Sequence, residues 1–196
     1  MTDKEWDRLL HIRTSGRDDS RADTFRYPYE PTPYAVLERL AGSGYLRKED
    51  VLLDYGCGKG RVGFFLSSQA GCRVTGIDYD ERLLAKALEN RESAVKSRKT
   101  EFVLSPAEKY AVPPEANRFY FFNPFSVELL QAVWGQIRES FYDNPRELLL
   151  FFYYPSEEYI SWLMTVPELE FLDEISCGDL FEGDERERIL IFQADG

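Results

Sequence analysis

Short apolar runs and segments with apolar residues at helical spacing alternate along the chain. The apolar runs predict strands at residues 51–54, 72–78, 101–104, 117–122, 147–154, 168–176 and 187–193. The helically spaced segments predict helices at about 33–41 and 60–69, after Asp80, over 127–141 and from Pro155 to about Met164. Such alternation is typical of a three-layer α/β fold in which helices cover both faces of a mostly parallel sheet.

The two ends of the chain depart from this alternation. The last two predicted strands are separated only by glycines and acidic residues, which predicts a hairpin whose final strand runs antiparallel. Residues 1–32 begin with a short helical pattern and end in a stretch rich in tyrosine and proline. We therefore expect an N-terminal helix and cap segment over 1–32 and the main domain over 33–196. Thr32 is expected to cap the helix that begins at Pro33.

A glycine-rich turn follows the first predicted strand. The stretch VLLDYGCGKGRVG, residues 51–63, ends its apolar run in Asp54 and then places glycine at alternate positions before a helical pattern. Glycine permits positive φ and lets a ligand lie directly on the backbone. The free N–H groups of the following helix point back at the turn. The pattern therefore predicts a ligand-binding turn.

Asp54, Gly56, Gly58 and Gly60 form the pattern DxGxGxG, which resembles motif I of the class I S-adenosylmethionine (SAM)-dependent methyltransferases. The fold of that family is Rossmann-like, and its seven-stranded, mostly parallel sheet ends in an antiparallel β-hairpin. The resemblance implies that the cofactor is SAM and the product S-adenosylhomocysteine (SAH). It also implies that these four residues and Cys57 contact the cofactor.

A dinucleotide is the alternative ligand of this turn. Gly58, Gly60 and Gly63 also fit GxGxxG, and Asp78 lies 20 residues past Gly58, where a ribose-binding acid is expected. However, residues 55–57 would separate that turn from its strand. A carboxylate at the end of the strand also suits the sulfonium and amino groups of SAM better than it suits a pyrophosphate.

Two later segments resemble further SAM-binding elements. GIDYD places Asp78, followed by Tyr79, where the family has its ribose-binding acid, and a carboxylate offers two acceptor oxygens to the two ribose hydroxyls. After the third predicted strand the family has an acid for the adenine amino group, but here Pro106 takes that place. The backbone N–H of Ala107 and the side chain of Glu108 are the candidates to replace it.

Asn123-Pro124-Phe125 follows the fourth predicted strand and is similar to the (Asn/Asp)-Pro-Pro-(Tyr/Phe) motif of amino-group methyltransferases, although it is one proline short. The resemblance implies that Asn123 lies in the active site, accepts hydrogen bonds from a target NH₂ and borders the cofactor. It also implies that Phe125 packs against the target group. The alternative is a simple proline turn before a helix capped by Ser126.

Tyr27 and Tyr29 lie in a stiff aromatic segment whose prolines exclude a regular helix or a central strand. In the class I methyltransferases the segment before motif I often folds over the SAM site. These tyrosines are therefore expected either to line the substrate mouth or to pack on the sheet edge. With Glu30 and solvent, they are the candidates to accept a proton from an amine.

Composition limits the functional classes. The 196 residues are 43% hydrophobic and carry a net charge of −11, which disfavours general nucleic-acid binding. No apolar run approaches the ~18 residues of a membrane span. The charged N-terminus lacks the apolar core of a secretion signal, and the three cysteines are scattered, so we expect a cytoplasmic protein without a metal site.

These observations predict a SAM-dependent methyltransferase that modifies an amino or amide nitrogen. The methyl acceptor is expected to be a protein side chain or a small molecule. A catalytically inactive binding module with the same fold and a nicotinamide-dependent oxidoreductase are the alternatives.

Overall fold

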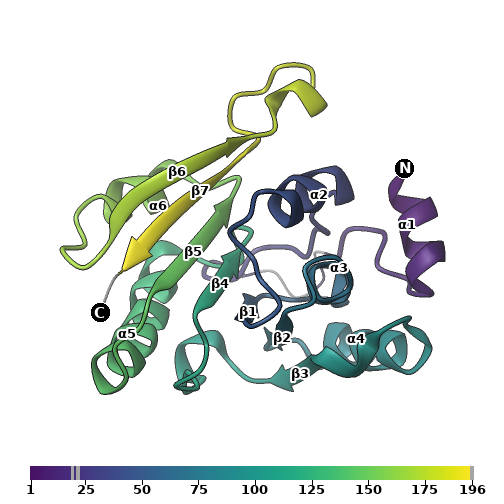
Figure 1. Cartoon of the computed structure of the whole chain (residues 1–196), viewed down its shortest axis with the longest axis horizontal. Coiled ribbons are helices and arrows are strands. Elements are labelled where there is room, and N and C mark those ends of the chain that lie inside the picture. The colour runs from purple at the N-terminus through teal and green to yellow at the C-terminus, as the bar shows by residue number, and fades with distance from the viewer. Residues whose placement is uncertain (19, 21–22, 195–196) are drawn as a thin grey trace.

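A single seven-stranded sheet forms the centre of the molecule (Figure 1). The computed structural model describes all residues except 19, 21–22 and 195–196. The strand order is β3-β2-β1-β4-β5-β7-β6, in which β7 pairs antiparallel with both β5 and β6 and the other pairs are parallel. The strands are β1 Val51–Tyr55, β2 Arg73–Asp78, β3 Thr100–Leu104, β4 Arg118–Phe121, β5 Leu148–Tyr153, β6 Glu170–Ser176 and β7 Arg188–Ala194. The predicted fold class and the predicted antiparallel hairpin are confirmed.

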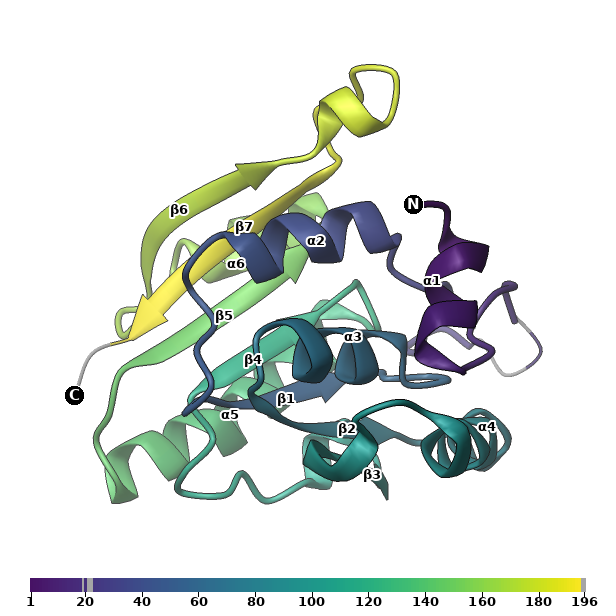
Figure 2. The ribbon, with the colours of Figure 1, turned by 45° about the vertical axis from the view of Figure 1, so that its right-hand side comes forward.

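Helices cover both faces of the sheet, as Figure 2 shows. Helices α1, α2 and α3 pack on one face, α5 and α6 pack on the other, and α4 packs on β2 and β3. The helices are α1 Asp3–Leu10, α2 Tyr34–Gly42, α3 Arg61–Gln69, α4 Glu81–Ser93, α5 Val127–Asp143 and α6 Glu157–Leu163, with short 3₁₀ turns at Ser97–Lys99, Ala107–Lys109 and Gly178–Leu180. No helix in the described part of the chain is long and apolar enough to cross a membrane.

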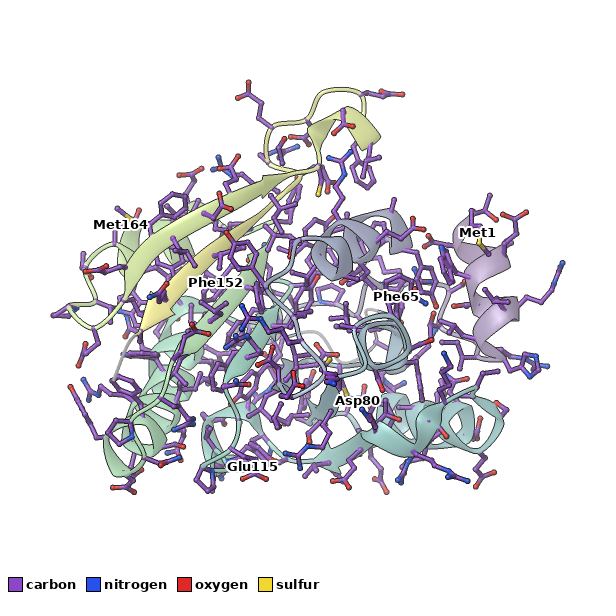
Figure 3. All side chains as sticks on the ribbon, viewed as in Figure 1. Met1, Phe65, Asp80, Glu115, Phe152 and Met164 are labelled. Carbon is purple, nitrogen blue, oxygen red and sulfur yellow. The ribbon has the colours of Figure 1, made fainter. Side chains whose placement is uncertain are left out.

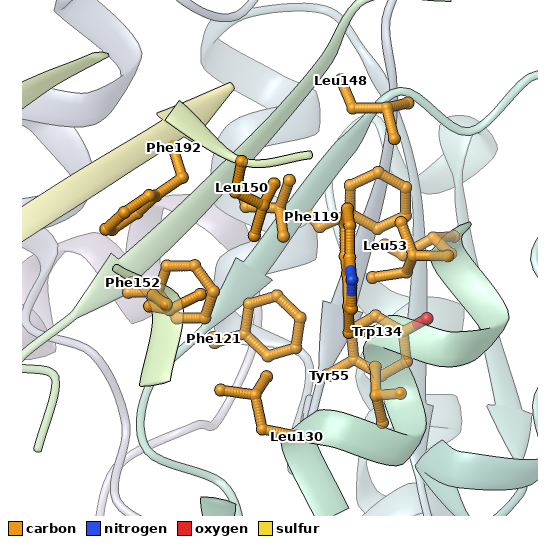
Figure 4. Close-up of a cluster of buried hydrophobic side chains, with 14 of the residues drawn as sticks. Leu53, Tyr55, Phe119, Phe121, Leu130, Trp134, Leu148, Leu150, Phe152 and Phe192 are labelled. Atoms are coloured by element: carbon orange, nitrogen blue, oxygen red, sulfur yellow. The ribbon is translucent and has the colours of Figure 1, made fainter. Parts of the chain in front are cut away.

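Aromatic side chains build much of the core between the sheet and α5. The Phe121 ring stacks between Tyr55 and Phe152, with centroid distances of 5.1 and 4.8 Å (Figure 4). Trp134 of α5 lies in the same buried cluster. Because Tyr55 and Phe121 end adjacent strands, this packing fixes the edge of the sheet where both strands stop.

Helix α1, near the N-terminus, packs into the core on the opposite face. Trp6 and Leu10 of α1 lie in one buried cluster with Tyr34 and Phe65. Trp6 meets Phe65 edge-on at a centroid distance of 5.0 Å, and Figure 3 shows Phe65 on the side of α3 that faces α1. The N-terminal segment is therefore held against the helix that follows the glycine turn.

Two predicted helix caps differ in the structure. Thr32 does not cap α2, because its hydroxyl lies 3.0 Å from the buried Tyr120 hydroxyl, and Pro33 stands at the N-cap position instead of the first helical turn. Ser126 stands at the N-cap position of α5 but makes no capping hydrogen bond. Asp80 caps α4, accepting a hydrogen bond from the Arg82 N–H.

Candidate functional site

The candidate site lies where the strand order reverses. From β1 the chain proceeds outward to β2 and β3 and then returns to place β4 on the other side of β1. Ligands of open α/β sheets bind at such a reversal, beyond the carboxyl ends of the strands. A cavity occupies that position, lined by residues that follow β1, β2 and β4 and by residues 26–32. Figure 3 marks its neighbourhood by Asp80, which follows β2 and lines the cavity.

Asp54, at the end of β1, is a buried carboxylate with an unsatisfied oxygen. The residue is 3% exposed and lines the cavity, and its Oδ2 has no hydrogen-bond partner among the described atoms. Burial, with a smaller contribution from the negative charge of Asp78, raises the pKa of Asp54 to about 8. A buried polar group without a partner costs stability. This oxygen is therefore suited to accept a hydrogen bond from a cationic ligand.

Asp78, at the end of β2, is held by the backbone. Its Oδ2 accepts a 2.8 Å hydrogen bond from Gly58 N, and its Oδ1 accepts one of 2.9 Å from Asp80 N. Burial raises its pKa to about 6, although both hydrogen bonds oppose this rise. The Tyr79 backbone also contributes a hydrogen bond, and because a carboxylate has about four acceptor sites, Asp78 can still accept a hydroxyl group.

The glycine turn closes tightly against its neighbours. Gly56 has φ +76°, and a Cβ there would lie 2.6 Å from Pro124 Cβ. Gly58 has φ +53°, and a Cβ there would lie 2.1 Å from the Tyr29 ring. Gly60 stands at the N-cap of α3. Gly56 and Cys57 line the cavity whereas Gly58 and Gly60 do not, and the bare backbone of Gly58 faces a tyrosine of the N-terminal segment.

Ala107 and Glu108, the candidates for adenine, line the cavity together with Tyr79, which follows the expected ribose-binding acid. The guanidinium of Arg26 lies there as well. Its Cζ stands 4.7 Å from the centroid of the Tyr79 ring, and its Nη2 lies 3.3 Å from Glu108 Oε1. Pro106, where the family has an acid, precedes the 3₁₀ turn that carries Glu108.

Both polar atoms of the Asn123 side chain form hydrogen bonds within the protein. Its Nδ2 donates to the Tyr154 carbonyl, and its Oδ1 accepts a 3.1 Å hydrogen bond from Ser156 N. Asn123 has φ +37° and does not line the cavity, whereas Pro124 and Phe125 do. The amide therefore ties the end of β4 to the end of β5, and it is not turned toward a ligand.

Tyr27 and Tyr29 both line the cavity but differ in environment. The Tyr29 hydroxyl donates a 2.7 Å hydrogen bond to the Thr14 carbonyl, and burial raises the pKa of Tyr29. Tyr27 is 40% exposed, and burial followed by the charges of Glu158 and Glu128 raises its pKa. Tyr27 thus lies at the mouth of the cavity, and Tyr29 forms part of its wall.

Arg61 joins the N-terminal segment to the glycine turn, a role that the sequence analysis missed. Arg61 is only 2% exposed. Its guanidinium donates hydrogen bonds from Nε to Thr14 Oγ1 at 2.7 Å and from Nη1 to the Thr32 carbonyl at 3.1 Å. It also pairs with Asp3 and stacks 4.4 Å from the Tyr34 centroid. The position directly after the third glycine of the motif was the only signal for it.

Two further cavity residues were missed. Arg26 could have been noticed as a cation between two aromatic residues in the segment expected to cover the site. Tyr55 is 1% exposed, and its hydroxyl has no partner among the described atoms. Within the described residues, no group of three or more His, Cys, Asp or Glu side chains could hold a metal ion.

Comparisons with known proteins agree with this geometry. A family model described as a methyltransferase domain matches residues 52–146. No curated protein sequence matches the chain.

Solved structures with the same fold include methyltransferases of several kinds. An RNA methyltransferase from Salinibacter ruber in complex with SAH is 21% identical, with a TM-score of 0.53 over 85% of this chain and 93% of that one. The glycopeptide N-methyltransferase MtfA complexed with SAM is 11% identical, with a TM-score of 0.64 over 82% and 87%. The StiE O-MT is 11% identical, with a TM-score of 0.60 over 81% and 73%. At these identities the likeness establishes the fold.

The family model covers the glycine turn, Asp78 and the Asn-Pro-Phe segment. The same residues include Asp54 and Asp78, the two acids at the ends of β1 and β2. Over residues 52–146 the chain therefore carries a methyltransferase domain of the class I, Rossmann-like type, which uses SAM as its cofactor.

Proposed function

We propose that the chain is an active SAM-dependent methyltransferase whose acceptor is the nitrogen of a cationic amine. The observation that carries the cofactor assignment is the unpartnered Oδ2 of Asp54, buried in the cavity at the end of β1. SAM carries an ammonium group and a sulfonium group, and either one is favoured beside this carboxylate. When bound, SAM supplies a methyl group that is already activated for displacement.

Each part of the cofactor has a candidate partner in this chain. Asp78 would accept a hydrogen bond from a ribose hydroxyl, because it is held in place by Gly58 N and Asp80 N. Tyr79 offers an aromatic face to adenine, and Glu108 offers a carboxylate to its amino group. With the donor activated, the remaining task of the protein is to position the acceptor.

The mouth of the cavity supports a cationic acceptor. Tyr27 lies there, 40% exposed, and the negative charges of Glu128 and Glu158 act on its hydroxyl. An aromatic face beside carboxylates attracts ammonium and guanidinium groups. The charge distribution agrees, because residues 101–196, which include both glutamates, carry 19 acidic and 6 basic residues, whereas residues 1–100 carry 16 and 18. This acidic half repels phosphate backbones.

The acceptor would lose its proton at the mouth of the cavity. Tyr29 is partly buried and its hydroxyl donates to the Thr14 carbonyl, so it is unsuited to accept a proton. Tyr27 and Glu30 border the cavity near solvent. We propose that the amine loses its proton to water at this mouth, and that Asn123 acts as a positioning residue for the loop after β4.

Calorimetric titration with SAH tests the cofactor site. We expect binding near micromolar, about −8 kcal/mol, which Asp78→Ala weakens at least tenfold. The Asp50→Asn variant is a matched control, because Asp50 is buried at the opposite end of β1, outside the cavity. A folded wild-type protein that binds neither SAM nor SAH would refute the assignment and favour a non-catalytic module.

Transfer of a labelled methyl group tests the acceptor. The assay would compare a polyamine, a lysine- and arginine-rich peptide, a catechol and a short RNA. We expect methylation of the first two only, and a loss of about tenfold in kcat/KM when Glu128 and Glu158 are both changed to Gln. Methylation of the RNA or the catechol alone would refute the amine assignment while leaving the SAM site standing.

A further inference from the structure

Arg26 fills the part of the cavity that is expected to bind adenine. Its guanidinium stands 4.7 Å from the centroid of the Tyr79 ring and 3.3 Å from Glu108 Oε1. The Arg26 and Glu108 side chains are only 23% and 22% exposed. A planar group that lies over an aromatic ring and donates N–H to a carboxylate has the same binding features as adenine, which is flat and carries an amino group.

The backbone around Arg26 is tied across the site. Arg26 forms an antiparallel bridge with Phe125, Ser126 N donates a 2.7 Å hydrogen bond to the Phe25 carbonyl, and Tyr27 N donates one of 3.2 Å to the Pro124 carbonyl. Residues 25–29 therefore run from the loop after β4 to the glycine turn. We call these five residues the strap.

The other end of the strap rests on the glycine turn. The Tyr29 ring lies so close to Gly58 that a Cβ there would stand 2.1 Å away. Lys59 Nζ is 5.0 Å from the centroid of the same ring. The strap thus reaches across the site from the glycine turn to the expected adenine position.

The space left beneath the strap is small. The cavity has a volume of about 80 Å³, whereas sites for molecules of this kind usually measure ~300–1,000 Å³. A nucleoside cofactor cannot enter while Arg26 and Tyr29 keep these positions. The described structure is therefore a closed form of the site.

We propose that Arg26 occupies the adenine position of the SAM site in the free protein, and that the strap must open before the cofactor binds. This inference rests on the proposed SAM site. Glu108 then has two alternative partners, the Arg26 guanidinium in the closed form and the adenine amino group in the bound form. Affinity for the cofactor is lowered by the stability of the closed form, because binding has to displace it.

The Arg26→Ala variant tests the proposal through the direction of its effect. Removing a half-buried ion pair and its contact with Tyr79 is expected to tighten SAH binding by about five- to tenfold. Arg17→Ala is the matched control, because Arg17 lies on the same N-terminal segment, pairs with Glu30 at 3.8 Å with both side chains well exposed, and does not line the cavity. We expect its SAH affinity to stay within twofold of the wild type.

The outcomes separate this inference from the proposed function. Weaker or unchanged binding by Arg26→Ala, in a protein whose wild type binds SAH, overturns the strap and assigns Arg26 no competing role. Failure of both folded proteins to bind SAH overturns the SAM site itself.

Amide hydrogen exchange gives a second readout that does not need a variant. The N–H groups of Tyr27 and Ser126 hold the strap in the closed form, so their exchange is expected to become faster when SAH saturates the protein. Ligands ordinarily slow the exchange of amides that they cover. Slower exchange of both amides in the complex would overturn the opening of the strap.

Discussion

Replacing Asp54 with asparagine is expected to stabilise the free protein while weakening its affinity for the cofactor. Asp54 is 3% exposed, its Oδ2 has no partner among the described atoms, and Asp78 adds a second negative charge nearby. Asparagine has nearly the same shape but no charge. The substitution therefore removes the cost of burying a carboxylate and leaves the packing unchanged.

The size and sign of the effect follow from the pKa of Asp54. Burial raises that pKa from an ordinary value near 3.8 to about 8. A carboxyl group with a raised pKa destabilises the folded state increasingly as the pH rises from its unfolded to its folded pKa. At pH 7 the upper limit is about 4 kcal/mol, at 1.36 kcal/mol for each pKa unit. Half of that amount would raise Tm by ~4–8 °C in a chain of this size.

Thermal unfolding between pH 4 and pH 8 measures this difference. Near pH 4 both side chains are neutral, and we expect equal Tm values. The advantage of Asp54→Asn should appear above pH 4, grow until about pH 8, and then level off. The same pH series should show SAH affinity of the wild type rising between pH 6 and 8, as Asp54 ionises, with a weaker and flatter response in the variant.

The Asp50→Asn variant is the matched control for stability. Asp50 is also buried, but it accepts hydrogen bonds from Arg47 N and Asn117 Nδ2 and pairs with Arg118 at 3.4 Å. The same chemical change should therefore destabilise the protein there. A Tm of Asp54→Asn that stays at or below that of the wild type at pH 8 would refute the reasoning, because it would show that Asp54 has a partner in the free protein.

Three further predictions concern the turn, the N-terminal segment and the loop after β4. Gly58→Ala should lower the free energy of unfolding by ~1–3 kcal/mol in denaturant titrations, because φ at this position is +53° and the new Cβ would collide with the Tyr29 ring. Adding Tyr29→Ala to this variant should restore part of the lost stability. Arg61→Met should lower the free energy of unfolding by ~3–5 kcal/mol and expose residues 1–32 to protease, because Asp3 and Asp7 lose the cation with which both are paired. Unchanged protease resistance would contradict this prediction. Asn123→Ala should lower stability by ~1–2 kcal/mol while kcat stays within about threefold, whereas a hundredfold fall in kcat would show that the amide contacts the acceptor after all.

Local patterns in the sequence were enough to predict the elements and their order. Strand and helix periodicity depends on residues close together in the chain, and so does the capping of α4 by Asp80. The positions of Asp54 and Asp78 at strand ends followed from the same patterns, because parallel strands that alternate with helices bring their carboxyl ends to one edge. The sequence therefore determined the fold class and the positions of two acids that line the candidate site.

Tertiary contacts decided which way the other side chains turn. Asn123 bonds residues 31 and 33 positions later, Thr32 meets Tyr120 instead of capping a helix, and Arg26 reaches Glu108 across 82 residues. Each of these contacts needs a partner that folding brings near from a distant part of the chain. Local spacing rules describe only residues that are close in sequence, so they could not predict these contacts. The sequence by itself thus determined where the candidate cofactor site lies, and only the packing of the N-terminal segment brought Arg26 and Tyr29 onto that site.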